Sequence, residues 1–339
     1  MKKVLVIGGT GAMGVYLVPE LLSHGYAVDV LSLDEVESDT PNLRYFKGNA
    51  RDENYVRSVL DEGQYDGVVD FMIYNQHEFP VRYSMFLDRT GHYIYLSTYR
   101  IYADEEHPIK ETSPRLVDVS PDEELRASND YCIYKAQGED VLRASSYSNW
   151  TIIRPAITYS TRRFQLVTHE MEKTVRRAIL GRTVILPREA KDKQATMTWA
   201  GDVAKMIACI LFNEKAMRET YTVSTAEHHT WGEVADMYAE LIGMKVIWVD
   251  AADYIAIKTF GYTNPPDVRQ ARWQLEYDRL FDRIVDNGKI LELMGKTQAD
   301  LMPLYEGLKL EIGKLPRDLW NANVVDAEDR YLQSHGYEV

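Results

Sequence analysis

The sequence has few cysteines, fewer basic than acidic residues, and no long hydrophobic run. Two cysteines in 339 residues, Cys132 and Cys209, do not make a disulfide framework, which indicates a reducing compartment. No stretch reaches the ~18 apolar residues of a membrane span, and no signal-peptide cleavage site follows the first apolar residues. We therefore expect a soluble, cytoplasmic protein that has no membrane partner.

The charge balance also argues against nucleic acid as a partner. Lys and Arg number 39 and Asp and Glu 52, so the net charge is −13 with neutral histidines. A chain this acidic lacks the global positive field of a nucleic-acid-binding domain, although a local basic groove would escape this count. Hydrophobic residues make up 45% and charged residues 27%, as in ordinary globular proteins. The length suggests about two domains of ~150 residues each.

The first half of the chain alternates short apolar runs with helical patterns. This alternation predicts an α/β fold with a doubly wound parallel sheet of the Rossmann type. The expected strands are 4–7, 28–33, 43–47, 67–72, 93–96 and 151–153, and the expected helices are 13–24, one after Asp52, 81–89 and 129–145. Residues 104–125 contain three prolines and are expected to form a long loop.

The pattern loosens beyond residue 155. We expect an amphipathic helix at 165–180, strands at 183–186, 221–224 and 245–249, a helix at 203–212, and mostly helix from 251 onward. Thr230 and Glu233 predict a capping box for a helix that runs through 242. We assign 1–158 to a dinucleotide-binding domain, to which 199–225 return. We assign 159–198 and 226–339 to a smaller, mainly C-terminal α+β substrate-binding domain.

Three glycines, Gly8, Gly11 and Gly14, follow the first strand and open a helix. In this context they allow a phosphate to approach the backbone, and the phosphate charge then sits at the helix N-terminus. The alternative is a tight turn without a ligand. Asp34 follows the second strand, where a carboxylate can bind the ribose hydroxyls. No arginine follows that strand to bind a 2′-phosphate, which favours NAD and leaves NADP open.

Tyr131 and Lys135 lie four residues apart on an expected helix and so share a face. A free phenol has a pKa of ~10, and lowering it by ~3 units takes ~4 kcal/mol. One ammonium ~4 Å away supplies about that energy at an effective dielectric of ~20. Lys135 could therefore prepare Tyr131 as a general acid/base. The alternative is a surface pair. Thr98, at the carboxyl end of a strand, could bind the same substrate oxygen.

These elements, in this order, resemble the extended short-chain dehydrogenase/reductase superfamily, in its NAD-dependent epimerase/dehydratase group. The segments that carry the resemblance are the glycine loop 8–14, the turn 48–52, the segment 97–102, the Tyr131–Lys135 pair, Arg154-Pro155 and the helix start 199–204. The resemblance implies the catalytic residues Thr98, Tyr131 and Lys135. It also implies a cofactor site made of Gly8, Thr10, Gly11, Ala12, Met13, Gly14, Ser32, Asp34, Asn49, Ala50, Met72, Lys135 and Pro155.

The resemblance implies a nucleotide sugar as substrate and an epimerase or a ketoreductase/dehydrogenase as the activity, with a homodimer left open. Candidate substrate residues are Asn75, Tyr99, Arg100, Tyr159, Arg162 and Trp199. Ser32 replaces the family's frequent acid. Tyr99-Arg100 stand where sugar 4,6-dehydratases carry Asp-Glu, which disfavours that reaction. The alternative function is a non-catalytic NAD(P)-binding regulatory or RNA-binding relative. No histidine or cysteine cluster has metal-ligand spacing, so no metal is expected.

Overall fold

The computed structural model describes residues 1–316 and 326–339, and these form two compact units. The first unit comprises Met1–Thr158, Thr198–Ala226 and Asp286–Met302. The second comprises Tyr159–Met197, Glu227–Val285 and Pro303–Val339. The strands β7 (Ile157–Tyr159) and β10 (Met197–Trp199) contain residues at which the chain passes from one unit to the other.

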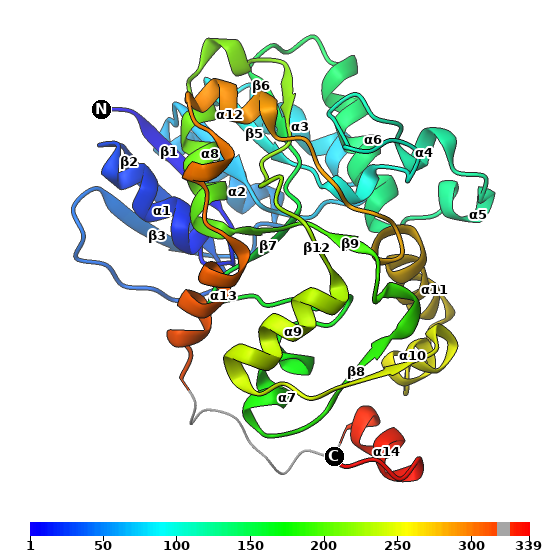
Figure 1. The fold of residues 1–339 in the computed structure, drawn as a ribbon. Helices are drawn as coiled ribbons and strands as arrows, with labels where there is room; N and C mark the ends of the chain where they lie inside the picture. Colours follow the sequence, from blue (N-terminus) through cyan, green and yellow to red (C-terminus); the bar gives the residue numbers. More distant parts are fainter. Residues whose placement is uncertain (317–325) are drawn as a thin grey trace. The chain divides into compact units, whose positions relative to one another are not determined.

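The first unit is built on a seven-stranded parallel sheet in the order β11-β6-β5-β4-β1-β2-β3 (Figure 1). The strands are β1 (Lys3–Ile7), β2 (Ala27–Ser32), β3 (Leu43–Lys47), β4 (Gly67–Asp70), β5 (His92–Leu96), β6 (Trp150–Ile153) and β11 (Glu219–Tyr221). The predicted Rossmann-type sheet is therefore confirmed.

Helices cover both faces of this sheet, and the side chains of each strand alternate between them. Val4 and Val6 of β1 pack in a core with α1 (Gly14–Ser23), α8 (Ala200–Ile210) and α12 (Gly288–Met294). Leu5 and Ile7 pack in a second core with α2 (Glu53–Gly63), α3 (Phe79–Leu87) and α6 (Tyr131–Ala144). Because both faces are covered, β1 is a continuous apolar run.

The second unit combines short strands with several helices. Its strands are β8 (Val184–Pro187), β9 (Gln194–Ala195), β12 (His229–Thr230) and β13 (Val246–Val249), with β8 parallel to β13 and β9 antiparallel to β12. Its helices are α7 (Val175–Ile179), α9 (Trp231–Ile242), α10 (Ala251–Lys258), α11 (Pro265–Gln274), α13 (Leu304–Gly313) and α14 (Ala327–Ser334). The capping box of α9 is present: Glu233 N donates to Thr230 Oγ1 over 3.1 Å, and Thr230 N donates to Glu233 Oε2 over 2.8 Å.

Four sequence-based expectations differ from the structure. Residues 104–125 are not wholly a loop, since they include α4 (Leu116–Val119) and α5 (Glu123–Arg126), the latter capped by Asp122. The helix expected at 165–180 is limited to η2 (Met171–Lys173) and α7, because residues 164–169 form a buried loop in which Leu166 and His169 make an isolated antiparallel bridge around a turn. The strand expected at 221–224 is β11, which ends at Tyr221.

The fourth difference concerns residues 286–302, which the sequence pattern assigned to the second domain. They belong to the first unit, because α12 packs on α8 and buries Ile290 and Leu291 in the same core. Among the helices of residues 1–316 and 326–339, none is long and apolar enough to span a membrane.

Candidate active site

The glycine loop between β1 and α1 is tightly constrained by its own backbone. Gly8 has φ +78°, and its N–H donates to Leu31 O over 2.8 Å. A Cβ added to Gly14 would lie 2.2 Å from Gly9 O, so only glycine fits where the helix starts against the loop. The first turn of α1 has no side-chain cap and no acidic residue. Its N–H groups are therefore suited to an anion.

A cavity of about 520 Å³ opens beside this loop. Eight predicted cofactor residues line it: Gly8, Thr10, Gly11, Ser32, Asp34, Asn49, Ala50 and Met72. The structure does not place Ala12, Met13, Gly14, Lys135 or Pro155 in its lining. The loop and the cavity suit a dinucleotide, because a cavity lined mostly by uncharged residues lies beside an uncapped helix start.

Two hydroxyl-bearing residues of the cavity lining, Thr10 and Ser32, are hydrogen-bonded to each other. Thr10 Oγ1 and Ser32 Oγ lie 2.7 Å apart and share a hydrogen bond, and Ser32 Oγ also accepts from Asp34 N over 2.9 Å. The side chain of Asp34 is exposed. Ser32 thus holds the backbone of Asp34 in place, and Asp34 presents the nearby carboxylate.

Sequence reasoning missed Gly48 and Arg51, which also line the cavity. A Cβ on Gly48 would lie 1.9 Å from the ring of Tyr55, so any larger residue at this position would clash with that ring. The guanidinium of Arg51 pairs with Glu78 at 2.6 Å and donates to Ile73 O over 3.2 Å. Both residues belong to the 48–52 turn, which carries part of the family resemblance, so the sequence could have indicated them.

The helix α6 carries Tyr131 and Lys135 on one face. Asp130 caps the helix by accepting from Cys132 N over 3.0 Å. The Lys135 ammonium lies 5.8 Å from the centre of the Tyr131 ring and donates to Leu96 O over 2.6 Å and to Met72 O over 3.3 Å. These carbonyls stand at and just beyond the carboxyl ends of β5 and β4. The alternative of a surface pair therefore fails for Lys135, which is fully buried.

Burial lowers the pKa of Lys135 to about 8, and the charges of Asp70 and Glu139 oppose part of that change. Asp70 ends β4 and accepts from Met72 N over 2.9 Å and from the Tyr93 hydroxyl over 2.8 Å. Burial raises the pKa of Asp70 as well, although these hydrogen bonds and the charge of Lys135 lower it. The end of β4 thus presents a buried carboxyl group, Asp70, and α6 presents a buried amine, Lys135.

Thr98 follows β5 and is buried. Its Oγ1 accepts from Arg100 N over 3.2 Å and caps the short helix η1 (Tyr99–Ile101), which packs on α6. Tyr99 N donates to Pro155 O over 3.1 Å, and the Arg100 guanidinium lies 5.3 Å from the centre of the Tyr131 ring. The structure therefore brings the Thr98 segment and the start of α6 together.

A buried ionic network supports this arrangement, and the sequence analysis did not identify its centre, Glu139. Glu139 Oε1 accepts from Ser97 Oγ over 2.5 Å and from Arg154 Nε over 2.8 Å, and Oε2 accepts from Arg154 Nη2 over 2.6 Å. Burial alone would raise the pKa of Glu139, but Arg154, Arg143 and the Ser97 hydroxyl lower it below its ordinary value. The network joins β5, β6 and α6 at residues adjacent to Thr98 and Pro155.

The candidate substrate residues have different surroundings. Asn75 Oδ1 accepts from the N–H groups of His77 and Glu78 and so caps a turn. Tyr99 is buried, and Trp199 packs edge-on against Tyr16 at 5.1 Å and close to Gly201. Tyr159 and Arg162 lie in the second unit, the first buried and the second exposed. Their roles toward a substrate stay predictions. No cluster that could hold a metal ion occurs within residues 1–316 and 326–339.

Residues 4–224 match the model of the NAD dependent epimerase/dehydratase family. The chain therefore belongs to this family, and the resemblance seen in the sequence is confirmed. The family is described as NAD dependent, which confirms NAD as the expected cofactor.

Two relatives show what the sequence is similar to. The chain is 25% identical over 257 residues to the chloroplast stem-loop binding protein of 41 kDa b from Arabidopsis thaliana, covering 71% of this chain and 64% of that one. It is 28% identical over 138 residues to the UDP-glucose 4-epimerase of Lacticaseibacillus casei, covering 33% and 40%. The chain thus spans less than two thirds of the length of either relative.

A solved structure of UDP-glucose 4-epimerase from Thermus thermophilus, in complex with NAD, has a similar fold. Its TM-score is 0.65 at 19% identity, over 92% of this chain and 98% of that one. At this identity the likeness supports the fold alone.

Proposed function

We propose that this protein is an NAD-dependent enzyme that oxidises and reduces a hydroxyl carbon of a nucleotide sugar, with Thr98, Tyr131 and Lys135 as its catalytic residues. The observation that carries the proposal is the fully buried ammonium of Lys135, which lies beneath the Tyr131 ring and bonds the carbonyl of Met72, a residue of the cofactor cavity. A lysine is rarely buried without a functional or ionic reason.

The chain's own residues divide the chemistry in a simple way. Tyr131 takes the proton of the substrate hydroxyl, Lys135 stabilises the phenolate by its positive charge, and Thr98 orients the substrate oxygen by a hydrogen bond. Bound NAD supplies the acceptor for the hydride. If hydride returns to the opposite face of the carbon, the enzyme is an epimerase; if the ketone leaves, it is a dehydrogenase or ketoreductase.

Two observations support the substrate class and narrow the reaction. Relatives that carry the name UDP-glucose 4-epimerase match this chain at 28% and 32% identity over shorter segments. Tyr99 and Arg100 follow Thr98, so that position offers no carboxylate pair to eliminate water. We therefore favour epimerisation or alcohol oxidation over 4,6-dehydration.

The test is turnover of UDP-glucose and other nucleotide sugars by the wild type and by Tyr131→Phe. Loss of the hydroxyl should lower turnover by about 10²–10⁴-fold, the usual contribution of general acid–base catalysis, while NAD binding is kept. Tyr134→Phe is the matched control, because Tyr134 lies on the same helix and its ring meets that of Tyr131 at 5.6 Å. Equal turnover in wild type and Tyr131→Phe would refute the proposal.

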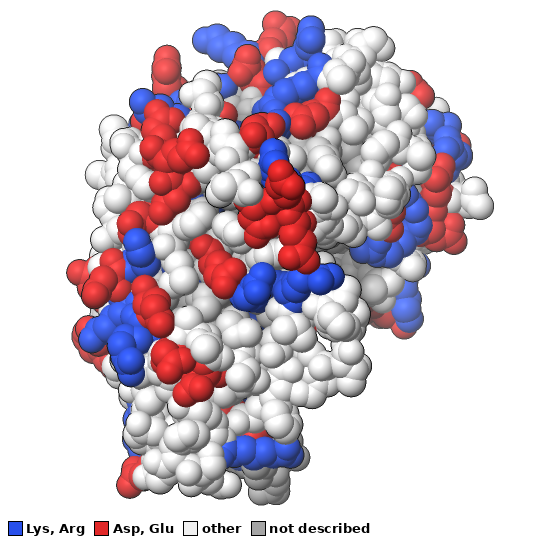
Figure 2. Space-filling model, turned by 90° about the vertical axis from the view of Figure 1, so that its right-hand side faces the viewer, with Lys and Arg blue, Asp and Glu red and all other residues white. Residues whose placement is uncertain are grey.

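A second candidate, RNA binding, is favoured by the match to the Arabidopsis stem-loop binding protein over 71% of this chain. The charge of the molecule opposes it. Figure 2 shows a face on which acidic and basic side chains are interspersed, with an acidic group near its middle. Titration with a stem-loop RNA at 50 and 200 mM salt decides this candidate, because binding by phosphate contacts weakens steeply with salt.

A further inference from the structure

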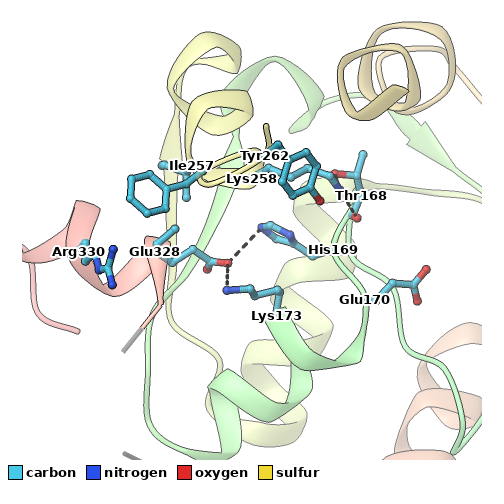
Figure 3. A pocket seen from close by; sticks show the side chains of 11 residues that line it. Thr168, His169, Glu170, Lys173, Ile257, Lys258, Tyr262, Glu328 and Arg330 are labelled. Atoms are coloured by element: carbon cyan, nitrogen blue, oxygen red, sulfur yellow. Dashed lines mark hydrogen bonds and ion pairs between the residues drawn. The ribbon is translucent and has the colours of Figure 1, made fainter. Parts of the chain in front are cut away.

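The second unit contains a cavity of about 450 Å³ that none of the predicted catalytic or cofactor residues lines. Three segments far apart in the sequence form it: residues 168–173, residues 257–262 at and after the end of α10, and residues 327–330 at the start of α14 (Figure 3). Its volume is in the range of small-molecule sites.

One part of the wall is apolar and incompletely covered. Ile257, Phe260 and Tyr262 line it, and the two rings are 60% and 49% exposed, respectively. Large apolar side chains grouped at a cavity mark a surface that a ligand can cover. The flat rings favour a ligand that itself carries a ring.

An adjoining part of the wall is cationic. Arg330 stacks on Phe260, with its guanidinium 5.3 Å from the ring centre. Its side chain makes no hydrogen bond or ion pair with any residue that the structure describes, so its planar donors remain available for a carboxylate or phosphate. Lys258 and Lys173 add positive charge, and Lys258 Nζ is fixed by donating to Thr168 O and Thr168 Oγ1 over 2.8 Å each.

A buried carboxylate lies beneath the same wall. Glu328 is 1% exposed, and its Oε2 is closed off from solvent. The cations near it are Arg177, with Nε 3.2 Å from Oε2, and Lys173, with Nζ 3.6 Å from Oε1. These two cations balance the charge of Glu328, so the cavity keeps the positive charge of Arg330 and Lys258.

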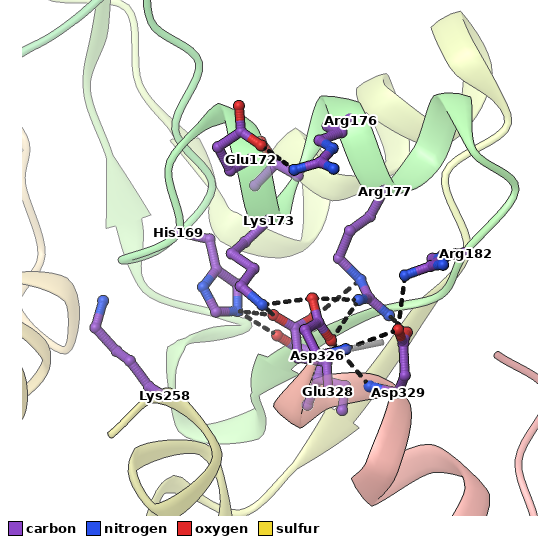
Figure 4. A network of polar contacts seen from close by, with 12 residues as sticks. His169, Glu172, Lys173, Arg176, Arg177, Arg182, Lys258, Asp326, Glu328 and Asp329 are labelled. Carbon is purple, nitrogen blue, oxygen red and sulfur yellow. Dashed lines mark hydrogen bonds and ion pairs between the residues drawn. The ribbon is translucent and has the colours of Figure 1, made fainter. Parts of the chain in front are cut away.

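The start of α14 is held in this position by ion pairs with basic residues of the segment 173–182 (Figure 4). Asp326 lies 2.5 Å from Lys173 and 2.9 Å from Arg177, and Asp329 lies 2.8 Å from Arg177 and 2.7 Å from Arg182. Arg330 takes part in none of these ion pairs. They also mean that a ligand in the cavity should stabilise the docked helix.

We propose that this cavity is a second ligand site, which binds a small organic anion that carries a ring. The ring lies against Phe260 and Tyr262, and the anionic group binds Arg330. The site is independent of the NAD-dependent reaction proposed above.

The test is calorimetric titration of the full chain, saturated with NAD, with 4-hydroxyphenyl phosphate and with 4-hydroxybenzoate. We expect at least one probe to bind, and the better one identifies the anionic group as phosphate or carboxylate. Arg330→Gln should weaken binding about tenfold or more, the usual effect of losing a charge-assisted hydrogen bond. Arg272→Gln, on α11 beside Glu276, is the control and should bind as the wild type does.

Amide hydrogen exchange locates the probe independently of affinity. Binding should slow exchange in residues 168–173 and in α14. Failure of both probes to bind, equal binding by Arg330→Gln and wild type, or protection confined to the glycine loop would overturn the proposal. Arg330 is exposed, so its substitution leaves folding intact and each of these outcomes is informative.

Discussion

At the scale of single residues, Lys135 has two proposed roles: it stabilises the phenolate of Tyr131 and it contributes to the binding of NAD. Its ammonium is held by the carbonyls of Leu96 and Met72, at the ends of two parallel strands, and lies beneath the ring of Tyr131. We predict that Lys135→Met lowers turnover by at least ~10²-fold, because the phenolate loses its counter-charge. It should also weaken NAD binding in a calorimetric titration. Lys205→Met, at an exposed position of α8, should change neither property.

Glu139 offers a prediction about stability. Its carboxylate neutralises the fully buried guanidinium of Arg154. Glu139→Gln would leave that charge unpaired, and breaking a buried pair on one side costs about 3–5 kcal/mol. We expect the midpoint of urea unfolding to fall accordingly. Asp140→Asn, at the next and exposed residue of α6, should unfold within ~0.5 kcal/mol of the wild type. Equal loss in both variants would contradict the assigned role of the network.

The sequence pointed to those candidate residues whose proposed chemistry follows from local spacing. Tyr131 and Lys135 are one helical turn apart, and Gly8, Gly11 and Gly14 lie between a strand and a helix. Glu139 could not be identified in this way, because a glutamate on a helix is usually solvated and its burial depends on Ser97 and Arg154, which are far away in the sequence.

At the scale of helices and strands, the same distinction separates successful from failed predictions. The strand β1 and the helix α9 carry strong periodicity or a capping box, and both are found as predicted. The short helices α4 and α5 were missed among prolines, because helices of four residues depend on caps and packing rather than on a repeating pattern. Residues 286–302 were assigned to the wrong domain, since their place depends on the contact of α12 with α8.

The docking of α14 leads to a prediction about pH. Burial raises the pKa of Glu328 to about 7, and the charges of Arg177 and Lys173 lower it by less. A carboxyl whose folded-state pKa exceeds its unfolded value of 4.5 stabilises least when ionised, so its contribution falls as pH rises from about 4.5 to 7. Glu328→Gln should therefore slow α14 amide exchange at pH 8, because it should raise the free energy of opening α14 by up to about 3 kcal/mol. At pH 5 the substitution should have little effect.

The effect of Glu328 is isolated by comparing the wild type with Glu328→Gln at each pH. This comparison is necessary because the pKa values of neighbouring groups are lowered, whereas that of Glu328 is raised. Burial lowers the pKa of His169 to about 3, and the charges of Lys258, Lys173 and Arg177 act in the same direction, so its contribution to stability falls as pH drops below 6.5. Hydrogen bonds and charges outweigh burial at Asp326 and lower its pKa to about 2, so its contribution is lost only in strong acid. Glu338→Gln, at an exposed position near Lys245, is the control. Faster α14 exchange in Glu328→Gln at pH 8 would contradict the prediction.

At the scale of the whole molecule, the proposed function divides between the two units. The first is expected to bind NAD and to carry the catalytic residues, and the second is expected to bind the substrate. The first contains the family's sheet, the glycine loop and all three proposed catalytic residues. The family match ends at residue 224, so most of the second unit lies beyond it. The sequence predicted the cofactor class and the sheet, because they depend on a shared motif. It could not predict the substrate, because that depends on side chains without a common pattern.

The preference for NAD over NADP can be measured through the thermal stability of the whole chain. A bound dinucleotide at about 100 times its Kd should stabilise the folded chain by about 2.7 kcal/mol. Asp34 is exposed in the cofactor cavity, and a 2′-phosphate near it would be repelled. We therefore expect NAD to raise the unfolding temperature more than NADP at equal concentration, and Asp34→Asn to reduce the difference. Glu37→Gln, at an exposed position of the same loop, should keep it. Stronger stabilisation by NADP would contradict the prediction and would indicate that Arg51, on the same cavity, binds the phosphate.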